Sequence, residues 1–136
     1  MRASFYKRGY YAELKLCELL QERGWWACRI PRSGKYVVGD IVAIKDGKIL
    51  LFEIKRRSKE GTIYIDRENY EEMIMAELRT GGTFWLALYA PERETGIRKW
   101  KFRRVRDADF VTEKHAIYRV RGLNAKKWCD LDTVLR

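Results

Sequence analysis

Cysteine, proline and histidine are scarce in this chain, and the shortages of cysteine and histidine argue against two kinds of site. The 136 residues include three cysteines, two prolines and one histidine. The cysteines at positions 17, 28 and 129 show neither metal-ligand spacing nor a disulfide framework, which favours a reducing cytoplasm. A metal site built from histidines finds little support, because His115 stands alone and is expected to be structural or exposed.

Long apolar runs and acidic residues are also in short supply. No stretch approaches the roughly 20 apolar residues that span a bilayer, and the charged, aromatic N-terminus is unlike a signal peptide. We therefore expect a cytoplasmic protein, cellular or viral, that does not enter a membrane. The 29 Lys and Arg exceed the 19 Asp and Glu, giving a net charge of +10. This surplus favours a polyanionic partner, with nucleic acid as the first candidate and an anionic membrane surface as the second.

A β-hairpin is predicted around Asp46-Gly47, which two apolar runs flank. Both central residues of a type I′ turn need positive φ, and Asp-Gly is a favoured pair there. A two-residue turn places Asp40 opposite Glu53, and Lys55 points to the same face because side chains alternate along a strand. The other directly opposed pairs are Lys45 with Lys48, Ile44 with Ile49, and Val42 with Leu51.

Asp40 and Glu53 bring like charges together at one end of this hairpin. The repulsion would force a proton onto one carboxylate, unless a divalent cation lies between them. Hard oxygen ligands suit magnesium or manganese. The alternative is that Lys55 simply pairs with Glu53 at a hydrated strand end. The metal interpretation gains weight because both strands are apolar on both faces and so are expected to be covered on both sides. The face opposite the charges carries Ile41, Ala43, Leu50, Phe52 and Ile54.

A helix from about Ser4 to Arg23 is expected to place Glu13 among apolar side chains, with Gly24 after its end. Two interpretations of Glu13 stay open. It is either a boundary glutamate that reaches solvent or a lysine, or a third carboxylate directed at the hairpin site. Lys7 and Arg8 precede it and are candidate phosphate contacts. The stripe at three- and four-residue spacing consists of Tyr6, Tyr10, Glu13, Leu16, Cys17 and Leu20.

The segment between an expected strand at Trp25–Ile30 and Asp40 is a loop by its Pro, Ser and Gly content. It leads directly to Asp40 and must lie beside the predicted site. Ordinary turn chemistry is a sufficient explanation for Ser33-Gly34, so a role for the hydroxyl is one of two interpretations. The candidate phosphate contacts in this region are Arg29, Arg32, Lys35 and, through its hydroxyl, Ser33.

A second helix is expected from about Arg67 to Arg79, capped by Asp66 and ended by Gly81-Gly82. A basic loop that carries Arg56 and Arg57 as candidate DNA contacts precedes it, with an extended stretch near Tyr64. The apolar face of this helix is expected to consist of Tyr70, Met73, Ile74 and Leu78.

Two strands are expected after the second helix, at Thr83–Tyr89 and Arg98–Arg103. The first is apolar on both faces, so we place it centrally. The second alternates: Trp100 and Phe102 are expected in the core, and the basic face is either solvated or a DNA track. That basic face consists of Lys99, Lys101 and Arg103. Further on, an extended stretch at 116–121 and a short helix near 124–129 are expected.

The order helix, strand, hairpin, helix, strand, strand predicts an α/β (α+β) fold with a mixed sheet flanked by helices. An early helix glutamate, an aspartate at a strand start and a strand Glu-x-Lys together resemble the PD-(D/E)xK nuclease superfamily, and within it the archaeal-type Holliday junction resolvases. The resemblance ends near Arg104, and Gly39 stands where the superfamily name has proline. The segments that carry it are Lys7-Arg8-Gly9 with Glu13, Arg29–Gly34, Asp40–Val42, Glu53–Lys55, Gly81-Gly82 and Trp100–Phe102.

The length of 136 residues and the hydrophobic fraction of 46% predict one domain over residues 1–136. The resemblance implies that this is a nuclease domain with a restriction-endonuclease-like core, and that it forms a homodimer that nicks opposing strands of a four-way DNA junction. It implies Mg²⁺, replaceable by Mn²⁺, and no small-molecule cofactor. The implied metal ligands are Asp40, Glu53 and the Ile54 carbonyl, with Glu13 added through water or a second ion. Lys55 would orient the attacking water or stabilise charge on the phosphorane, and Ser33 would contact the scissile phosphate.

Two rival interpretations remain at this point. One is another nuclease of the same superfamily, restriction-like or involved in repair, that cuts duplex or flap DNA with the same residues. The other is a DNA-binding module without catalysis, for which the register of Asp40 with Glu53 would be accidental. A panel of DNA substrates with and without magnesium separates all three.

Overall fold

The computed structural model describes the backbone of residues 5–31 and 38–136, with side chains from residue 9 onward in those ranges. Ser33, Arg32 and Lys35 lie outside the described residues, as do the side chains of Lys7 and Arg8. Among the described helices, none is long and apolar enough to cross a bilayer. The elements are α1 (Phe5–Glu22), β1 (Trp26–Arg29), β2 (Ile41–Lys45), β3 (Lys48–Arg56), β4 (Ile63–Asp66), α2 (Arg67–Thr80), β5 (Thr83–Pro91), β6 (Arg98–Arg104), β7 (Phe110–Val111), β8 (His115–Tyr118), the 3-10 helix η1 (Gly122–Lys127) and α3 (Leu131–Leu135).

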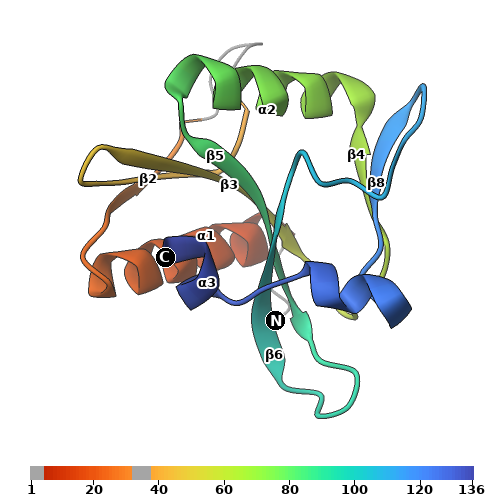
Figure 1. Cartoon of the computed structure of the whole chain (residues 1–136). Helices are drawn as coiled ribbons and strands as arrows, with labels where there is room; N and C mark the ends of the chain where they lie inside the picture. The colour runs from red at the N-terminus through yellow and green to blue at the C-terminus, as the bar shows by residue number, and fades with distance from the viewer. Residues whose placement is uncertain (1–4, 32–37) are drawn as a thin grey trace.

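A mixed five-stranded sheet forms the centre of the described structure, in the order β1-β2-β3-β5-β6. Only β3 and β5 are parallel, and the other neighbouring pairs are antiparallel. A parallel pair needs a crossover connection, and here β4 and α2 supply it. α2 covers one face of the sheet, and α1 and α3 cover the other (Figure 1). The expected mixed sheet flanked by helices is confirmed.

The predicted hairpin is present with the predicted register. Asp46 and Gly47 both have positive φ, at 51° and 78°, as a type I′ turn requires. The ladder runs from Lys45 opposite Lys48 to Ile41 opposite Phe52. Local turn chemistry therefore decides which residues of β2 and β3 meet.

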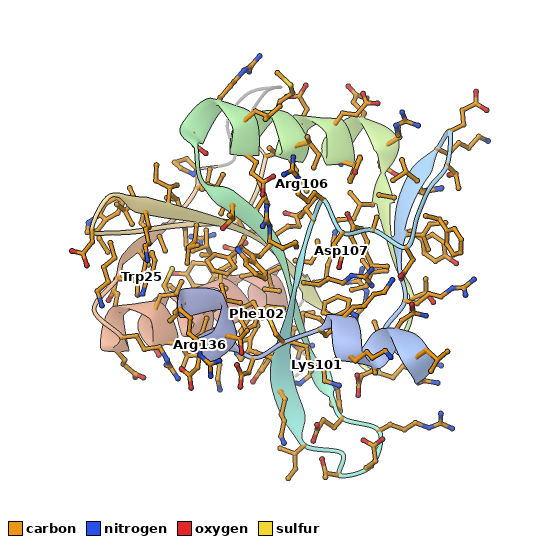
Figure 2. All side chains as sticks on the ribbon, in the orientation of Figure 1. Trp25, Lys101, Phe102, Arg106, Asp107 and Arg136 are labelled. Carbon is orange, nitrogen blue, oxygen red and sulfur yellow. The ribbon has the colours of Figure 1, made fainter. Side chains whose placement is uncertain are left out.

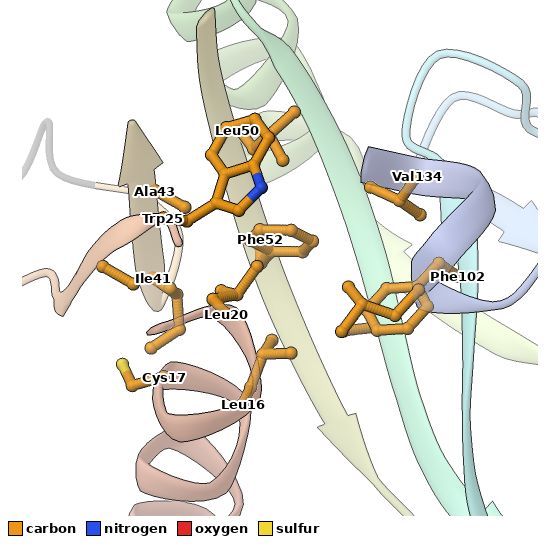
Figure 3. Close-up of a cluster of buried hydrophobic side chains, with 13 residues drawn as sticks. Leu16, Cys17, Leu20, Trp25, Ile41, Ala43, Leu50, Phe52, Phe102 and Val134 are labelled. Atoms are coloured by element: carbon orange, nitrogen blue, oxygen red, sulfur yellow. The ribbon is translucent and has the colours of Figure 1, made fainter. Parts of the chain in front are cut away.

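Two hydrophobic clusters fill the space on either side of the sheet. Figure 3 shows the first, where Leu16 and Leu20 of α1 lie near Phe52 of β3, and Val134 of α3 lies near Phe102. The second lies between the sheet, α2 and the small sheet β4-β8-β7. Side chains alternate along β3, so Leu50 and Phe52 belong to the first cluster and Leu51 belongs to the second.

The segment after Arg104, to which no role was assigned from the sequence, is part of both clusters. Val105, Ala116 and Tyr118 are buried in the second cluster, and Val134 of α3 in the first. The 3-10 helix η1 lies close to the expected short helix, whereas α3 was not expected. Its five residues are too few to show an amphipathic period.

Helix α2 differs from its prediction at its N-terminal cap and at the C-terminal end of its apolar stripe. Asp66 occupies the N-cap position but its side chain makes no capping hydrogen bond, and it lies 3.7 Å from Nε2 of His115 instead. Leu78 is 64% exposed, and Glu77 is buried in its place. Glu77 pairs with Arg104 and Arg106. Figure 2 shows Arg106 next to α2. The arginines at and just after the end of β6 thus provide the partners that allow Glu77 to be buried on this face of α2.

Each basic residue on this face of β6 has an acidic partner within the fold, although the Lys99 side chain remains 54% exposed. Lys99 pairs with Glu92 at 3.0 Å. Arg103 is 1% exposed and pairs with Asp109 at 2.9 Å. The third basic residue of the face, Lys101, pairs with Glu60 at 2.7 Å. The charges of the face are therefore used within the fold, while the expected burial of Phe102 is confirmed.

Candidate active site

Asp40 is fixed at the end of the hairpin, one residue before β2. It is 5% exposed, and its backbone N–H donates to the Phe52 carbonyl at 2.7 Å. Its Oδ2 accepts a hydrogen bond from the Ile54 N–H at 2.7 Å. The carboxylate is thus held against β3 by a backbone donor, which restricts its orientation more than a side-chain donor would.

Glu53 and Lys55 lie on the neighbouring stretch of β3 and form an ion pair of 3.7 Å between Oε2 and Nζ. Their side chains are 19% and 25% exposed respectively, so both remain accessible to solvent. Leu51 is buried in the cluster on the α2 side, and alternation places Glu53 and Lys55 on that side too. An accessible carboxylate and ammonium therefore stand on β3, the strand whose backbone holds Asp40.

Gly39 precedes Asp40 with φ of +92°, in the region that favours glycine. A Cβ at this position would lie 2.8 Å from Cζ of Phe84. Proline fixes φ near −65°, so it cannot adopt this conformation. Glycine at the position where the superfamily name has proline is therefore required by the backbone conformation of this chain. That conformation sets the direction in which the chain enters Asp40.

Glu13 is buried, as the helical stripe predicted, but its described partner is an arginine. It is 5% exposed, and its Oε2 lies 2.5 Å from Nε of Arg29. The Arg29 guanidinium also lies 4.5 Å from the ring centroid of Tyr10. Arg29 shares a strand face with Ala27, which packs with α1. Glu13 and Glu53 therefore approach the sheet from opposite faces.

The donor chemistry of Asp40 and Glu53 fits a hard divalent cation. Two carboxylates and a strand carbonyl such as that of Ile54 supply oxygen ligands only, and magnesium retains waters for the remaining positions. Within residues 5–31 and 38–136, no group of three or more His, Cys, Asp and Glu residues is arranged to hold a metal. Asp40 and Glu53 are thus the two carboxylates that suit a cation, and Glu13 is not placed as a direct third ligand.

The residues directly after Lys55 were expected to form a basic loop, but they continue the pairing of β3 with β5. Arg56 belongs to β3, opposite Tyr89 of β5, and the N–H of Arg57 donates to the Tyr89 carbonyl. Arg98 was not expected at this place: its Nη1 donates to the carbonyls of Arg57 and Tyr89. The antiparallel pairing of β6 with β5 brings it here, which the sequence could show only once that pairing was known.

Comparison with known proteins adds an independent line of evidence. The family model described as archaeal Holliday junction resolvase (Hjc) matches residues 4–136. The crossover junction endodeoxyribonuclease Hjc of Sulfolobus acidocaldarius is 28% identical over 132 residues, covering 95% of this chain and 87% of that protein. That of Sulfurisphaera tokodaii is 35% identical over 88 residues, covering 62% of this chain and 61% of that protein, which is less than two thirds of its length.

A solved structure extends the comparison to the fold. The structure of Archaeoglobus fulgidus Hjc, a Holliday junction resolvase from an archaeal hyperthermophile, matches with a TM-score of 0.75 at 25% identity. The match covers 91% of this chain and 97% of that chain. It confirms the expected restriction-endonuclease-like core. The family match also extends through the segment after Arg104, beyond the range that the short motifs covered.

Proposed function

This chain belongs to the archaeal Holliday junction resolvase family, and from that premise we propose that it is a magnesium-dependent endonuclease that resolves four-way DNA junctions. One observation supports the cleavage site above all others. The buried Asp40 carboxylate is anchored by the Ile54 N–H on the strand that carries the Glu53–Lys55 pair. A carboxylate, a backbone donor and an accessible ion pair meet where β2 begins and β3 approaches its end.

Asp40 and Glu53, with the Ile54 carbonyl, would hold the magnesium ion, and manganese would replace it. Bound there, the ion would make a coordinated water more acidic and offset charge on the phosphate oxygens. Lys55 orients the attacking water or stabilises charge on the phosphorane, since its ammonium is accessible and close to Glu53. Ser33 is proposed to contact the scissile phosphate.

Glu13 takes a supporting part in this proposal. Its carboxylate is paired with Arg29, so it acts on the site through water, through a second ion, or by holding Arg29. The residues proposed to contact phosphates are Lys7, Arg8, Arg29, Arg32, Lys35, Arg56 and Arg57. Their charges contribute to the net +10 of the chain, and phosphate contacts give affinity without reading sequence.

The active unit is proposed to be a homodimer. One constellation of Asp40, Glu53 and Lys55 cuts one strand, and a four-way junction yields two intact duplexes only when two strands are cut at symmetric positions. Two-fold dimers are the commonest oligomers, and their symmetry matches that of the substrate.

The test is to incubate the protein with four-way junction, linear duplex and flap DNA, with and without magnesium. Resolution requires paired nicks in the junction that depend on magnesium. Cleavage of plain duplex or flap at an equal rate would favour a general nuclease of the superfamily. Salt-dependent binding without cleavage would favour a DNA-binding module.

A further inference from the structure

A basic groove, whose lining does not include Asp40 or Glu53, lies between the segment that enters β4 and the segment that leaves β8. Its volume is about 280 Å³. None of its residues belongs to the proposed cleavage site. Its lining includes Lys59, Glu60, Gly61, Thr62, Arg119 and Arg121.

The pairing of β4 with β8 explains how the groove forms. The strands are antiparallel, with Ile63 opposite Tyr118, so residues just before β4 lie beside residues just after β8. Val120 is 2% exposed and packs in the second cluster, whereas Arg119 and Arg121 are exposed. Side chains alternate along an extended chain, so one buried valine directs both guanidinium groups toward solvent.

The positive charge of the groove is not cancelled by its own carboxylate. Glu60 is 7% exposed; its Oε2 accepts from Nζ of Lys101 at 2.7 Å and its Oε1 accepts from the Arg93 N–H at 3.2 Å. Among the described residues, no acidic side chain forms an ion pair with Lys59 or Arg121. Lys101 therefore neutralises the buried Glu60 carboxylate, and the exposed cations of the groove remain available to an anion.

The groove is also close to the proposed cleavage site along the chain. Lys59 is four residues after Lys55, so their Cα atoms are at most about 14 Å apart even if the chain is fully extended. Since each base pair adds about 3.4 Å of rise, this distance spans about four base pairs of duplex DNA. A DNA arm that leaves the cleavage site can thus reach the groove within half a helical turn.

We propose that the groove formed by Lys59, Arg119 and Arg121 binds backbone phosphates of a junction arm, within about four base pairs of the cut. The inference rests on the proposed function, because that function places DNA at Lys55. Contacts to phosphates carry no sequence information, so the groove would position the arm for any sequence.

Gly61 allows a charge to be added in the groove with little disturbance. A Cβ there would meet no atom within 4 Å, and the residue does not have a left-handed φ. Gly61→Glu places a carboxylate in the groove, and Gly61→Gln is its neutral control of equal size. Lys48→Ala is the control for a lost surface cation, because Lys48 begins β3 at the end opposite Arg56.

The experiment measures the Kd of each variant for a four-way junction across a salt series without magnesium, with the melting temperature as the check on folding. Gly61→Glu should bind about fivefold more weakly than Gly61→Gln at low salt. Its log K against log salt should have a slope shallower by about one. Lys59→Ala and Arg121→Ala should change in the same direction, and Lys48→Ala should match the wild type.

A second substrate tests the location. In this junction, neutral methylphosphonates replace the phosphates of the first five or so nucleotides beyond the cut, because the reach of the chain sets only the largest possible separation. The difference between Gly61→Glu and Gly61→Gln should disappear on it. Equal affinities of the two variants for ordinary junctions, or a difference that persists on the neutralised junction, would overturn the inference. A wild type that does not cut junctions, while the two variants still differ in binding, would overturn the proposed cleavage and leave the groove as a DNA contact.

Discussion

Arg29 of β1 and Glu13 of α1 form an ion pair of 2.5 Å on the sheet face opposite Glu53. The pair joins the first helix to the edge strand that leads toward Asp40. A carboxylate that the motif order assigns to catalysis is therefore also part of the contact between two elements. Activity and stability must be measured separately to learn which role dominates.

Glu13→Gln keeps a hydrogen-bond acceptor for Arg29 but removes the charge. We expect a loss of less than about 1 kcal/mol in the free energy of unfolding, because a neutral hydrogen bond remains. The cleavage rate should fall at least tenfold if the carboxylate acts on the site. Arg29→Ala and the double variant complete a cycle, with an expected coupling of about 1 to 2 kcal/mol. A Glu13→Gln protein that cuts at the wild-type rate would leave Glu13 a structural residue.

Asp40→Asn and Glu53→Gln should each abolish cleavage while junction binding persists. Each change removes a charged oxygen ligand and leaves the shape of the side chain nearly unchanged. The measurements are single-turnover cleavage with magnesium and Kd without it. Glu94→Gln is the control, since Glu94 is exposed in the turn between β5 and β6. Full magnesium-dependent activity in either site variant would refute the assignment.

Gly39→Ala should destabilise the protein by about 1 to 3 kcal/mol, because it combines a positive φ with a Cβ 2.8 Å from Phe84. Asp40 is the next residue, so the cleavage rate should fall as well. Gly9→Ala in α1 is the matched control: a Cβ there meets no atom within 4 Å, and alanine favours a helix. Urea unfolding of the three proteins checks this, and equal stability of Gly39→Ala and wild type would contradict the role of Gly39.

The buried pair of Arg103 and Asp109 predicts a dependence of stability on pH. The hydrogen bond from Arg103, supported by Lys127 and the Arg119 N–H, holds the pKa of Asp109 well below its ordinary value. The folded state thus binds this proton more weakly than the unfolded chain. Its contribution is complete above the unfolded pKa of about 3.9 and is lost as the pH falls from there toward the folded pKa.

Asp109→Asn should therefore flatten the acid limb of a plot of unfolding free energy against pH. At neutral pH it should cost about 3 kcal/mol, because it leaves the Arg103 charge buried without its carboxylate. Asp66→Asn is the control, since the Asp66 side chain is 74% exposed. Parallel curves for wild type and Asp109→Asn between pH 2 and 6 would show that another group controls acid unfolding.

A mixed dimer of wild type and Asp40→Asn tests the proposed assembly. The intact protomer should nick one strand, while paired symmetric cuts within one binding event should largely disappear, because each site serves one strand. Differently tagged chains allow the mixed species to be purified, and a circular junction substrate distinguishes one nick from two. A protein that is monomeric at working concentration, or a mixed dimer that still makes paired cuts, would oppose a homodimeric resolvase.

The hairpin and its register follow from the sequence alone. Asp46-Gly47 specifies the turn, and alternation then decides which side chains of β2 and β3 share a face. This is local information, because every step depends on residues near each other in the chain. It was sufficient to bring Asp40 to the strand that carries Glu53 and Lys55. The order of the helices and strands along the chain predicted the mixed sheet flanked by helices.

Only the tertiary structure decided the partners of the long charged side chains. Arg103 belongs to an alternating basic strand, yet Asp109 buries it; Glu13 meets Arg29, and Lys101 meets Glu60. Part of the requirement for Gly39 comes from Phe84, a residue far along the chain, and the rest from the positive φ of Gly39 itself. Burial of a charge depends on whether a distant segment brings an opposite charge or covers it, and periodicity contains no information about that segment. The local pattern thus determined where the carboxylates lie along the hairpin. The packing of the remaining chain determined which charged side chains are paired within the fold and which remain exposed.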